Sequence, residues 1–310
     1  MTARVTGLLM GTATTPKLSA TTDGWTAASR YEVVDRYPVD EPLAALWGIK
    51  PGAHTAAVVT RAPGTASGMV RWVDSAVTDR RKVPVETPGP FAFEFFANDV
   101  DGTYQGLADS DVFTPLAPPT TYDLHVIGSG ICRSFAVRGP GDFWAFITTI
   151  QQVPPPRELP VTPHYLSPVV NMPIATTDGA SAVALYRDVL GIPPRLDGPV
   201  QDAGVNAIMC APPDWAFHIT VFFIGDGMLC EHHIHPEGRL TPTRRPSDAL
   251  RSGPAVSTLL VDDLEAIIAA ATAAGIKVRG PVTLDREPYG TRRVACVDGP
   301  NNEIVELVQA

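Results

Sequence analysis

The sequence predicts an α+β protein made of four similar modules, each with the element order β-α-β-β-β. One observation is that the third quarter of the chain combines a single helix with several strand-like segments, and a second is that the fourth quarter repeats this order. A third is that stretches rich in proline or polar residues divide the chain into pieces of roughly 60–90 residues, since repetition at a fixed period exposes architecture. The 310 residues are enough for two domains.

The third module has the clearest pattern. A strand-like segment, Pro168–Thr176, precedes apolar residues that recur at helical spacing, and Gly191 is placed to end that helix. Three further strand-like segments follow it: Val205–Cys210, Trp215–Ile224 and Met228–His235. The Gly-Asp-Gly sequence at 225–227 predicts a hairpin between the last two.

The fourth module repeats this order. It begins with the strand-like Ala255–Val261, and a helix with one apolar face is expected to start at Asp263 and stop at Gly275. Two closing strands are predicted at Arg292–Val297 and Glu303–Val308.

The N-terminal half shows the same order less clearly. An opening strand and helix are expected within Gly7–Tyr37, and Leu43–Ile49 is matched to the end of a module helix. The later segments of the first two modules are expected at Ala56–Arg61, Gly68–Ser75, Pro90–Ala97, Gly102–Asp109, Ile131–Val137 and Phe143–Thr149.

A proline-rich segment predicts the domain boundary. Five prolines lie within Gln151–Tyr165, where they disfavour a helix or a central strand and favour an extended spacer. We therefore expect an N-terminal domain at 1–150, a linker at 151–165 and a C-terminal domain at 166–310.

The composition narrows the choice of partners. The net charge of −9 disfavours nucleic acid and anionic membrane surfaces, and no apolar run approaches the ~20 residues of a membrane span. The N-terminus lacks the apolar core of a secretory signal, and the four cysteines are widely separated, as is typical of reduced thiols. These features predict a cytoplasmic protein that binds neither nucleic acid nor a membrane, and they leave open whether it is a monomer or a homodimer.

Two segments of the C-terminal half resemble a known family. Tyr186–Ile192 (YRDVLGI) and residues 298–307 (DGPNNEIVEL) are similar to the helix exit and the final strand of the vicinal oxygen chelate superfamily, also called the glyoxalase / bleomycin resistance / extradiol dioxygenase superfamily. The resemblance implies that the four modules pair into two glyoxalase-like domains whose curved mixed sheets enclose cavities. Lyases, isomerases, oxygenases and drug-binding proteins share this fold, so the fold does not decide the function.

The resemblance also implies positions for a divalent metal on the first and last strands of paired modules. In the C-terminal domain these positions are Asn171, Glu231, Val256 and Glu306. Both carboxylates are present and both imidazoles are absent, which makes extradiol cleavage the least favoured activity. In the N-terminal domain no metal site is expected, because the corresponding residues are Trp72, Ala92 and Phe146.

The residues themselves support the two glutamates, since each interrupts an apolar strand. Glu231, His233 and His235 share one face of a strand because side chains alternate with a period of two. A carboxylate that faces a cavity needs a metal, a partner or a proton. The alternatives are a solvated edge-strand residue for Glu306 and a polar strand end for residues 231–236.

The possible ligands leave the metal open. Asn171, Glu231 and Glu306 alone are oxygen ligands that suit Mg²⁺ or Mn²⁺, whereas His233 would shift the preference toward Zn²⁺, Fe²⁺ or Ni²⁺. A site without metal is also possible, because a desolvated glutamate can act as a base.

Two functions follow from these residues. The first is a lyase or isomerase of the epimerase or dehydratase type, with Glu231 and Glu306 as catalytic groups acting on a hydrophobic carbonyl or hydroxyl compound. His235, Tyr289 and Arg292 are candidates for substrate binding. The second is a non-catalytic protein that binds a drug or metabolite.

Overall fold

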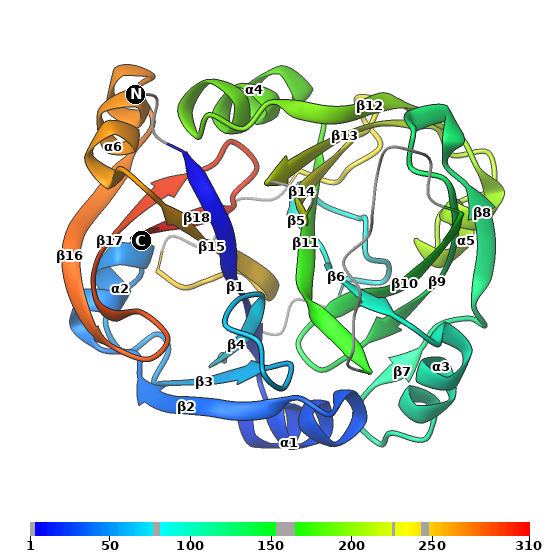
Figure 1. Cartoon of the computed structure of the whole chain (residues 1–310), viewed down its shortest axis with the longest axis horizontal. Helices are drawn as coiled ribbons and strands as arrows, with labels where there is room; N and C mark the ends of the chain where they lie inside the picture. The colour runs from blue at the N-terminus through cyan, green and yellow to red at the C-terminus, as the bar shows by residue number, and fades with distance from the viewer. Residues whose placement is uncertain (1–3, 77–80, 153–164, 225–226, 243–247) are drawn as a thin grey trace.

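The computed structural model describes residues 4–76, 81–152, 165–224, 227–242 and 248–310. Within these residues the strands form two curved mixed sheets, of eight and ten strands, that lie next to each other (Figure 1). Helices cover the outer sides of the sheets. The predicted α+β class with curved mixed sheets is confirmed.

The eight-stranded sheet, called here the terminal sheet, joins the first and fourth modules. Its strand order is β16-β17-β18-β15-β1-β4-β3-β2, with β1 and β15 paired antiparallel at its centre. Its strands are β1 (Val5–Thr15), β2 (Glu32–Pro38), β3 (Ala56–Arg61), β4 (Met69–Asp74), β15 (Gly253–Val261), β16 (Val278–Arg286), β17 (Gly290–Asp298) and β18 (Ile304–Gln309).

The ten-stranded sheet, called here the central sheet, joins the second and third modules. Its order is β12-β13-β14-β11-β6-β10-β9-β7, with β5 paired to β11 and β8 to β9. Its strands are β5 (Gly89–Pro90), β6 (Phe93–Ala97), β7 (Thr114–Pro115), β8 (Thr120–Asp123), β9 (Ile131–Arg138), β10 (Trp144–Gln152), β11 (Leu166–Thr176), β12 (Pro194–Val200), β13 (Phe217–Ile224) and β14 (Gly227–Ile234).

This pairing differs from the expected division into domains at 1–150 and 166–310. The proline-rich segment does not separate two sheets: it connects β10 to β11, which belong to the same sheet, and its residues 153–164 lie outside the described part. Because the first strands of the modules are all rich in apolar residues, each can pair with several others, and the pattern of apolar residues does not select among them.

Several helices begin where the sequence places an acceptor side chain, whereas α1 (Leu18–Ser29) begins after Lys17 without one. Asp99, Asp178 and Asp263 each accept a hydrogen bond from the backbone N–H three residues later, which caps the helix that follows. Gly191 has a φ of +70° just after the predicted helix of the third module, as expected. The helices are α1 (Leu18–Ser29), α2 (Glu41–Trp47), α3 (Val100–Ala108), the 3₁₀ turn η1 (His125–Ile127), α4 (Gly179–Ala184), its π-helical continuation η2 (Leu185–Val189), α5 (Ala203–Ile208) and α6 (Leu264–Ala273).

The prediction of a strand at Val205–Cys210 is wrong, because this segment overlaps α5. Asp202 Oδ1 accepts hydrogen bonds from the backbone N–H groups of Gly204 at 2.7 Å and Val205 at 3.0 Å, which starts a helix. The strand of this module is instead β12, whose prolines are tolerated because it forms the sheet edge. Residues 225–226 of the predicted hairpin lie outside the described part.

Leu43–Ile49 was matched to the end of a module helix, and this assignment is also wrong. The segment overlaps α2, an additional helix between β2 and β3, while α1 is the module helix. Asp40 caps α2, and Gly48, with a φ of +65°, ends it. Because the segment has a cap at its start and a glycine at its end, it forms a separate short helix.

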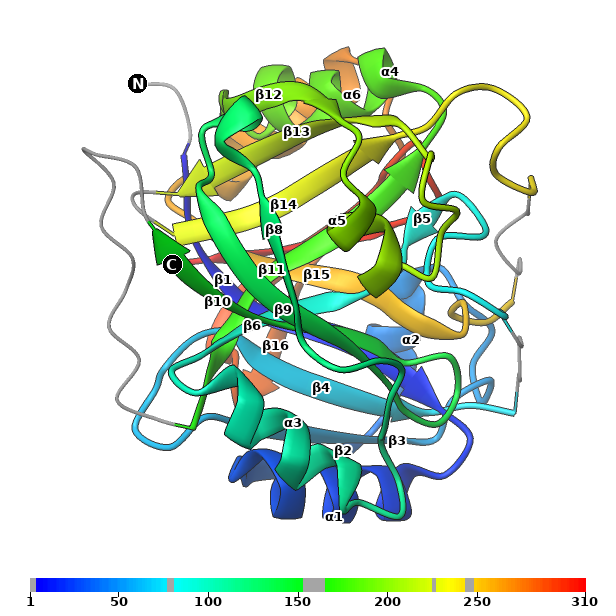
Figure 2. The ribbon, with the colours of Figure 1, turned by 90° about the vertical axis from the view of Figure 1, so that its right-hand side faces the viewer.

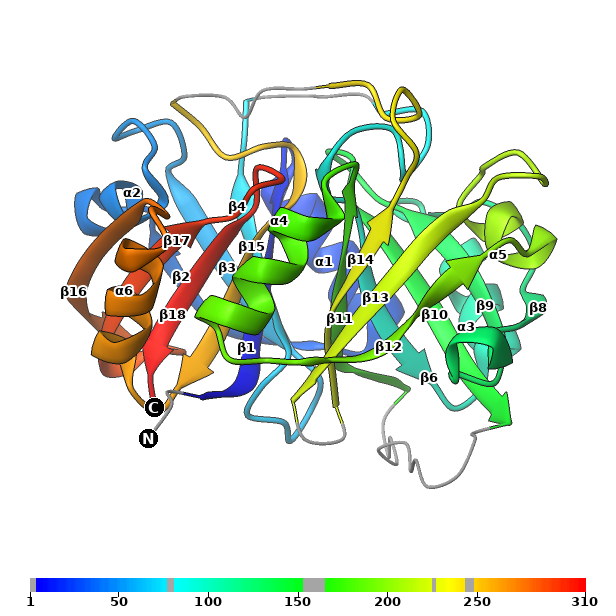
Figure 3. The ribbon, with the colours of Figure 1, turned by 90° about the horizontal axis from the view of Figure 1, so that it is seen from above.

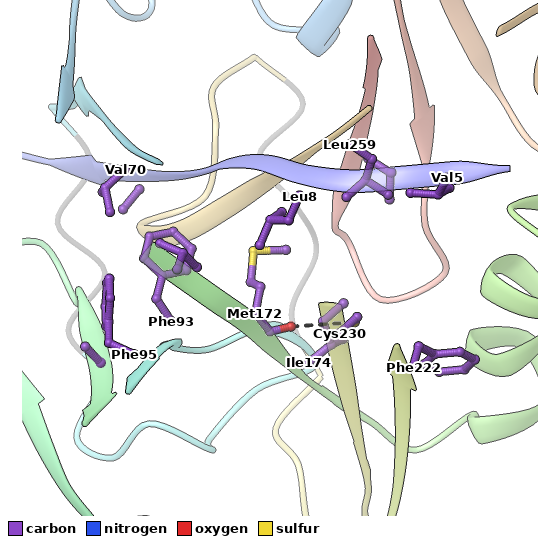
Figure 4. Close-up of a cluster of buried hydrophobic side chains, with 14 of the residues drawn as sticks. Val5, Leu8, Val70, Phe93, Phe95, Met172, Ile174, Phe222, Cys230 and Leu259 are labelled. Atoms are coloured by element: carbon purple, nitrogen blue, oxygen red, sulfur yellow. Dashed lines mark hydrogen bonds between the residues drawn. The ribbon is translucent and has the colours of Figure 1, made fainter. Parts of the chain in front are cut away.

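A shared core joins the two sheets where β1 passes β11. Leu8 of β1 and Met172 of β11 point toward each other between the sheets (Figure 4). A Cβ on Gly11 would lie 2.6 Å from the Phe93 ring, so only glycine permits this close approach. Burial of this cluster stabilises the two sheets as one body.

The described residues 81–88 and 235–242, from two connections between the sheets, lie near each other at one edge of the molecule (Figure 3). Thr241 N donates to Glu86 O at 2.9 Å, and Arg251 Nη1 donates to Pro88 O at 3.0 Å, so the two segments support each other. None of the described helices is long and apolar enough to cross a membrane.

Candidate functional site

The central sheet contains a pocket with about 620 Å³ of empty space, open solvent at its mouth included. Helix α5, which lies against β8 and β9 (Figure 2), contributes part of its lining. Most lining residues are apolar or aromatic: Phe96, Leu124, Phe146, Ile150, Val200, Val205, Ile208, Met209, Phe217 and Ile219. The polar ones are Glu94, Tyr122, Ser129, Cys132, Thr148, Glu231 and His233.

Two carboxylates on the pocket wall share one amide group. Asn171 Nδ2 donates to Glu94 Oε2 at 3.0 Å and to Glu231 Oε2 at 3.2 Å, using its two N–H groups. The three side chains come from the adjacent strands β11, β6 and β14, which explains why they meet. Glu94 and Glu231 therefore each accept a hydrogen bond from the same nitrogen atom, Asn171 Nδ2.

A line of hydroxyl groups leads to Glu94. Ser134 Oγ donates to Thr148 Oγ1 at 2.9 Å, and Thr148 Oγ1 donates to Glu94 Oε1 at 2.8 Å. Because each hydroxyl has a single proton, Tyr122 must donate to Ser134 Oγ, 2.8 Å away. The direction of the donors is thus fixed from Tyr122 to the carboxylate.

His233 forms the second polar group beside Glu231. Its Nε2 contacts Glu231 Oε1, and its ring stacks on Phe217 with centroids 4.7 Å apart and planes at 17°. The side chain of His233 is almost fully buried, and its Nδ1 has no hydrogen-bond partner among the described residues. His233 is one of the residues that line the pocket, so its Nδ1 is an unpartnered polar atom of a lining residue within the described part of the chain.

The neighbouring histidines have other surroundings. Trp215 Nε1 donates to His235 Nδ1 at 2.9 Å, while His232 lies on the opposite face of the strand against Tyr186 and Phe222. Burial lowers the pKa of both His232 and His235 to about 3. Both are neutral near pH 7, and neither belongs to the pocket lining.

Glu306 lies in the terminal sheet, in a closed network. Its Oε1 is 3.2 Å from Arg71 Nη2 and accepts hydrogen bonds from Thr258 and Tyr289, each at 2.8 Å. Its Oε2 accepts from Trp47 Nε1 at 2.9 Å. All five side chains are almost fully buried.

The cation of this network is Arg71. Burial alone would lower the pKa of Arg71, but the carboxylate of Glu306 holds it well above its usual range. The guanidinium also lies over the Trp47 ring, 4.7 Å from its centroid, and Nε donates to Thr12 Oγ1 at 2.8 Å. Glu306 is therefore neither a solvated edge residue nor a group open to a ligand pocket.

The structure thus divides the predicted site residues between the two sheets. Asn171, Glu231 and His233 come together in the central sheet, as do the neighbouring side chains of His235 and Trp215. Glu306 and Tyr289 lie in the terminal sheet, and Arg292 is a half-buried residue of β17 in that sheet. The expected joint site of Glu231 and Glu306 does not form.

Sequence reasoning missed Glu94 and Arg71. Each is a charged residue inside an apolar strand, the same signal that singled out Glu231. The metal positions of these two strands had been assigned to Ala92 and Trp72. Ala92 lies two residues from Glu94, and Trp72 lies one residue from Arg71. Val256 was likewise displaced from Thr258, which contacts Glu306.

The donor groups do not fit a resident divalent metal, the cofactor suggested by the sequence. In the central sheet, the amide N–H groups of Asn171 lie between the carboxylates and offer no lone pair. In the terminal sheet, the guanidinium of Arg71 takes the place of a cation beside Glu306. Across the described ranges, no three or more His, Cys, Asp or Glu side chains group as a metal site requires.

The fold and the pocket define a two-sheet protein of glyoxalase architecture. Residues 163–307 match the model of the Glyoxalase/Bleomycin resistance protein/Dioxygenase superfamily. The matched residues make up just under half of the chain and contain the third and fourth modules.

Solved structures share the fold over nearly the whole chain. Glyoxalase I from Zea mays is similar with a TM-score of 0.64 and 14% identity, over 98% of this chain and 92% of that one. A putative dioxygenase from Bacillus subtilis is similar with a TM-score of 0.62 and 12% identity, over 99% and 86%. At these identities the likeness shows the fold alone. No curated protein sequence matches the chain.

Proposed function

We propose that the chain catalyses a proton transfer of the lyase or isomerase kind in the pocket of the central sheet. Its substrate would be an apolar small molecule that carries a carbonyl or hydroxyl group. The observation that carries this proposal is the His233–Glu231 pair, with Glu94 nearby, on the wall of an otherwise apolar pocket.

His233 is the base in this proposal. With Nε2–H directed at the Glu231 carboxylate, the lone pair of a neutral imidazole lies on Nδ1, which can remove a proton from the carbon next to a carbonyl. Glu231 then stabilises the imidazolium that forms, and stacking on Phe217 fixes the ring orientation. Substrate electrons move to the carbonyl oxygen.

The outcome depends on where the proton returns. Return to the opposite face of the carbon gives epimerisation, while expulsion of a hydroxyl group from the next carbon gives dehydration. Glu94, at the end of the hydroxyl line from Tyr122, is the second group that can hold a proton. The apolar lining supports both reactions because it limits access of water.

Exchange of substrate hydrogen in D₂O tests the proposal. Wild-type protein and a panel of apolar ketones are incubated in D₂O, and loss of the C–H signal is followed by NMR. We expect exchange that His233→Ala and Glu231→Gln each slow by about 100-fold or more. The exposed Glu265→Gln in α6 is the matched control and should exchange like wild type.

Binding without catalysis is the second candidate, and the apolar character of most lining residues favours it. In this case ketones or other apolar compounds would bind with measurable heat, and no exchange would occur with any member of the panel. His233→Ala would then leave affinity nearly unchanged. That combination of results would refute the catalytic proposal and retain the pocket.

A further inference from the structure

Two polar residues line the pocket of the central sheet from different walls. His233, the base of the proposed reaction, lies on β14, and Ser129 lies in the turn between η1 and β9. In the order of the sheet, β11, β6 and β10 separate β14 from β9. A ligand in the pocket therefore lies between the strand that carries His233 and the turn that carries Ser129.

The turn holds Ser129 in a defined place. Its backbone N–H donates to Leu124 O at 3.0 Å, and Leu124 N donates to Gly130 O at 2.8 Å. Gly128 and Gly130, on either side of the serine, have φ of 79° and 100°, which glycine adopts without strain. The backbone bonds therefore keep this buried serine at the pocket and leave its side chain to face a ligand.

Three residues of the lining carry a hydroxyl group: Tyr122, Ser129 and Thr148. The proton of Tyr122 is used in the bond to Ser134, and the proton of Thr148 is used in the bond to Glu94. The hydroxyl of Ser129 makes no hydrogen bond to any residue of the described part. Its proton is therefore available to a ligand.

The nitrogen and sulfur groups of the lining provide no comparable donor. His233 Nε2 is directed at the carboxylate of Glu231. The thiol of Cys132, 4.0 Å from Gly130 O, is a weak donor. An acceptor atom on a ligand therefore finds its hydrogen-bond donor at Ser129.

We propose that Ser129 is a further catalytic residue, which donates a hydrogen bond to the carbonyl oxygen of the substrate. The inference rests on the proposed function and selects a ketone as substrate, with its oxygen at Ser129 and its reacting C–H at His233. When His233 Nδ1 takes the proton, the C–H electron pair forms a carbon–carbon double bond and the carbonyl π pair moves onto oxygen. Ser129 stabilises this oxyanion and keeps its own proton.

Infrared spectroscopy tests the contact without any need for turnover. The probe is 4-phenyl-2-butanone with a ¹³C-labelled carbonyl, bound to His233→Ala. A hydrogen bond lowers the stretching frequency of a carbonyl group, so we expect a lowered band that returns toward its value in an apolar solvent when Ser129→Ala is added. The matched control adds Ser67→Ala instead, at an exposed serine before β4, and should keep the lowered band.

Calorimetry on the otherwise wild-type chain checks the same contact. Ser129→Ala should weaken binding of the ketone about threefold to tenfold and leave binding of butylbenzene, which lacks the oxygen, unchanged. An equal effect on both compounds, or on neither, would overturn the inference. So would a carbonyl band that responds to Tyr122→Phe and not to Ser129→Ala, because the donor would then be the tyrosine.

Exchange of ketone hydrogen in D₂O measures the catalytic part. Ser129→Ala should slow exchange about 100-fold, mainly through kcat, because the hydrogen bond strengthens as charge develops on the oxygen. Ser129→Thr keeps the hydroxyl and should recover most of the rate. A Ser129→Ala variant that exchanges like wild type would refute the catalytic role.

The experiments also separate this inference from the proposed function. A band shift that depends on Ser129, without exchange by the wild-type chain, would assign the serine to ligand binding and refute the proposed function. Exchange that depends on His233 and not on Ser129 would retain the proposed function and overturn the inference.

Discussion

The terminal and central sheets are each built from two modules, and each has a glutamate on the last strand of a module. The two sheets differ in the side chains that surround this glutamate. In the terminal sheet, Arg71 neutralises Glu306 within a buried network. In the central sheet, Glu231 and Glu94 share the amide of Asn171 and line a pocket. The comparison shows that a carboxylate on these strands can belong either to the buried core, as Glu306 does, or to a pocket wall, as Glu231 does.

The additional helices follow the same division. Helix α2 lies between the second and third strands of the first module, and its Trp47 donates to Glu306. Helix α5 has the equivalent position in the third module and turns Val205, Ile208 and Met209 toward the pocket lining. Helix α2 therefore contributes to the buried core of the terminal sheet, whereas α5 forms part of the pocket wall in the central sheet.

Removing the cation should have the largest effect on stability. Arg71→Met leaves Glu306 buried without its partner, and we expect a loss of about 3–5 kcal/mol in the free energy of unfolding. Chemical denaturation measures it. The double variant Arg71→Met, Glu306→Gln should recover part of the loss, and a single variant as stable as wild type would contradict the role of this pair.

Acid should weaken the central sheet through His232. Its folded pKa of about 3 lies below the unfolded value of 6.5, so only the unfolded chain gains the proton as pH falls through this window. This histidine alone should lower the free energy of unfolding by about 2 kcal/mol between pH 6.5 and 4.5. In His232→Leu the stability curve should become less steep over this window, with the contribution of His235 remaining, and an unchanged curve would contradict a neutral, buried ring.

Rising pH should weaken the terminal sheet through Glu303. This buried residue precedes β18, its Oε2 accepts from the backbone N–H of Asn301 at 2.7 Å, and burial raises its pKa to about 7. The unfolded chain releases the proton above about 4.5, so stability falls up to about pH 7, by about 3 kcal/mol in all. Glu303→Gln should remove this fall, a change of slope opposite in sign to that of His232→Leu.

The indole of Trp47 should make a smaller contribution. Trp47→Phe removes the hydrogen bond to Glu306 Oε2 and weakens the contact with the guanidinium of Arg71, and we expect a loss of about 1–2 kcal/mol. Thermal and chemical denaturation measure it. Exchange activity in the other sheet should be unchanged, and a loss of exchange without unfolding would contradict the separation of the two networks.

Much of the fold could be predicted because its signals are local. The helix that begins at Asp263 carries its own cap, and the strands at Ala255–Val261 and Arg292–Val297 carry apolar patterns, so these elements appear where expected. The segment Val205–Cys210 was misassigned because Val205 and Ile208 suit a strand and a helix equally, whereas the cap at Asp202 starts a helix.

The pairing of modules and the composition of the site could not be predicted in the same way. β1 pairs with β15 rather than with β6, a choice that depends on packing between sheets and on no pattern within either strand. That choice places Glu94 opposite Asn171 and removes Glu306 from the pocket. Glu94 itself was within reach, since a charged residue in the strand FEFFA is the same signal that identified Glu231.

The pairing of β1 with β15 also fixes an order of events during synthesis. All strands of the central sheet, from β5 to β14, are synthesised before β15, whereas β1 must wait for a partner translated more than two hundred residues later, as the pairing of Val5 with Val261 shows. Such distant contacts form slowly. Until they form, the edge of β1 that pairs with β15 is open, so a nascent or truncated chain exposes a strand edge that can pair with another copy.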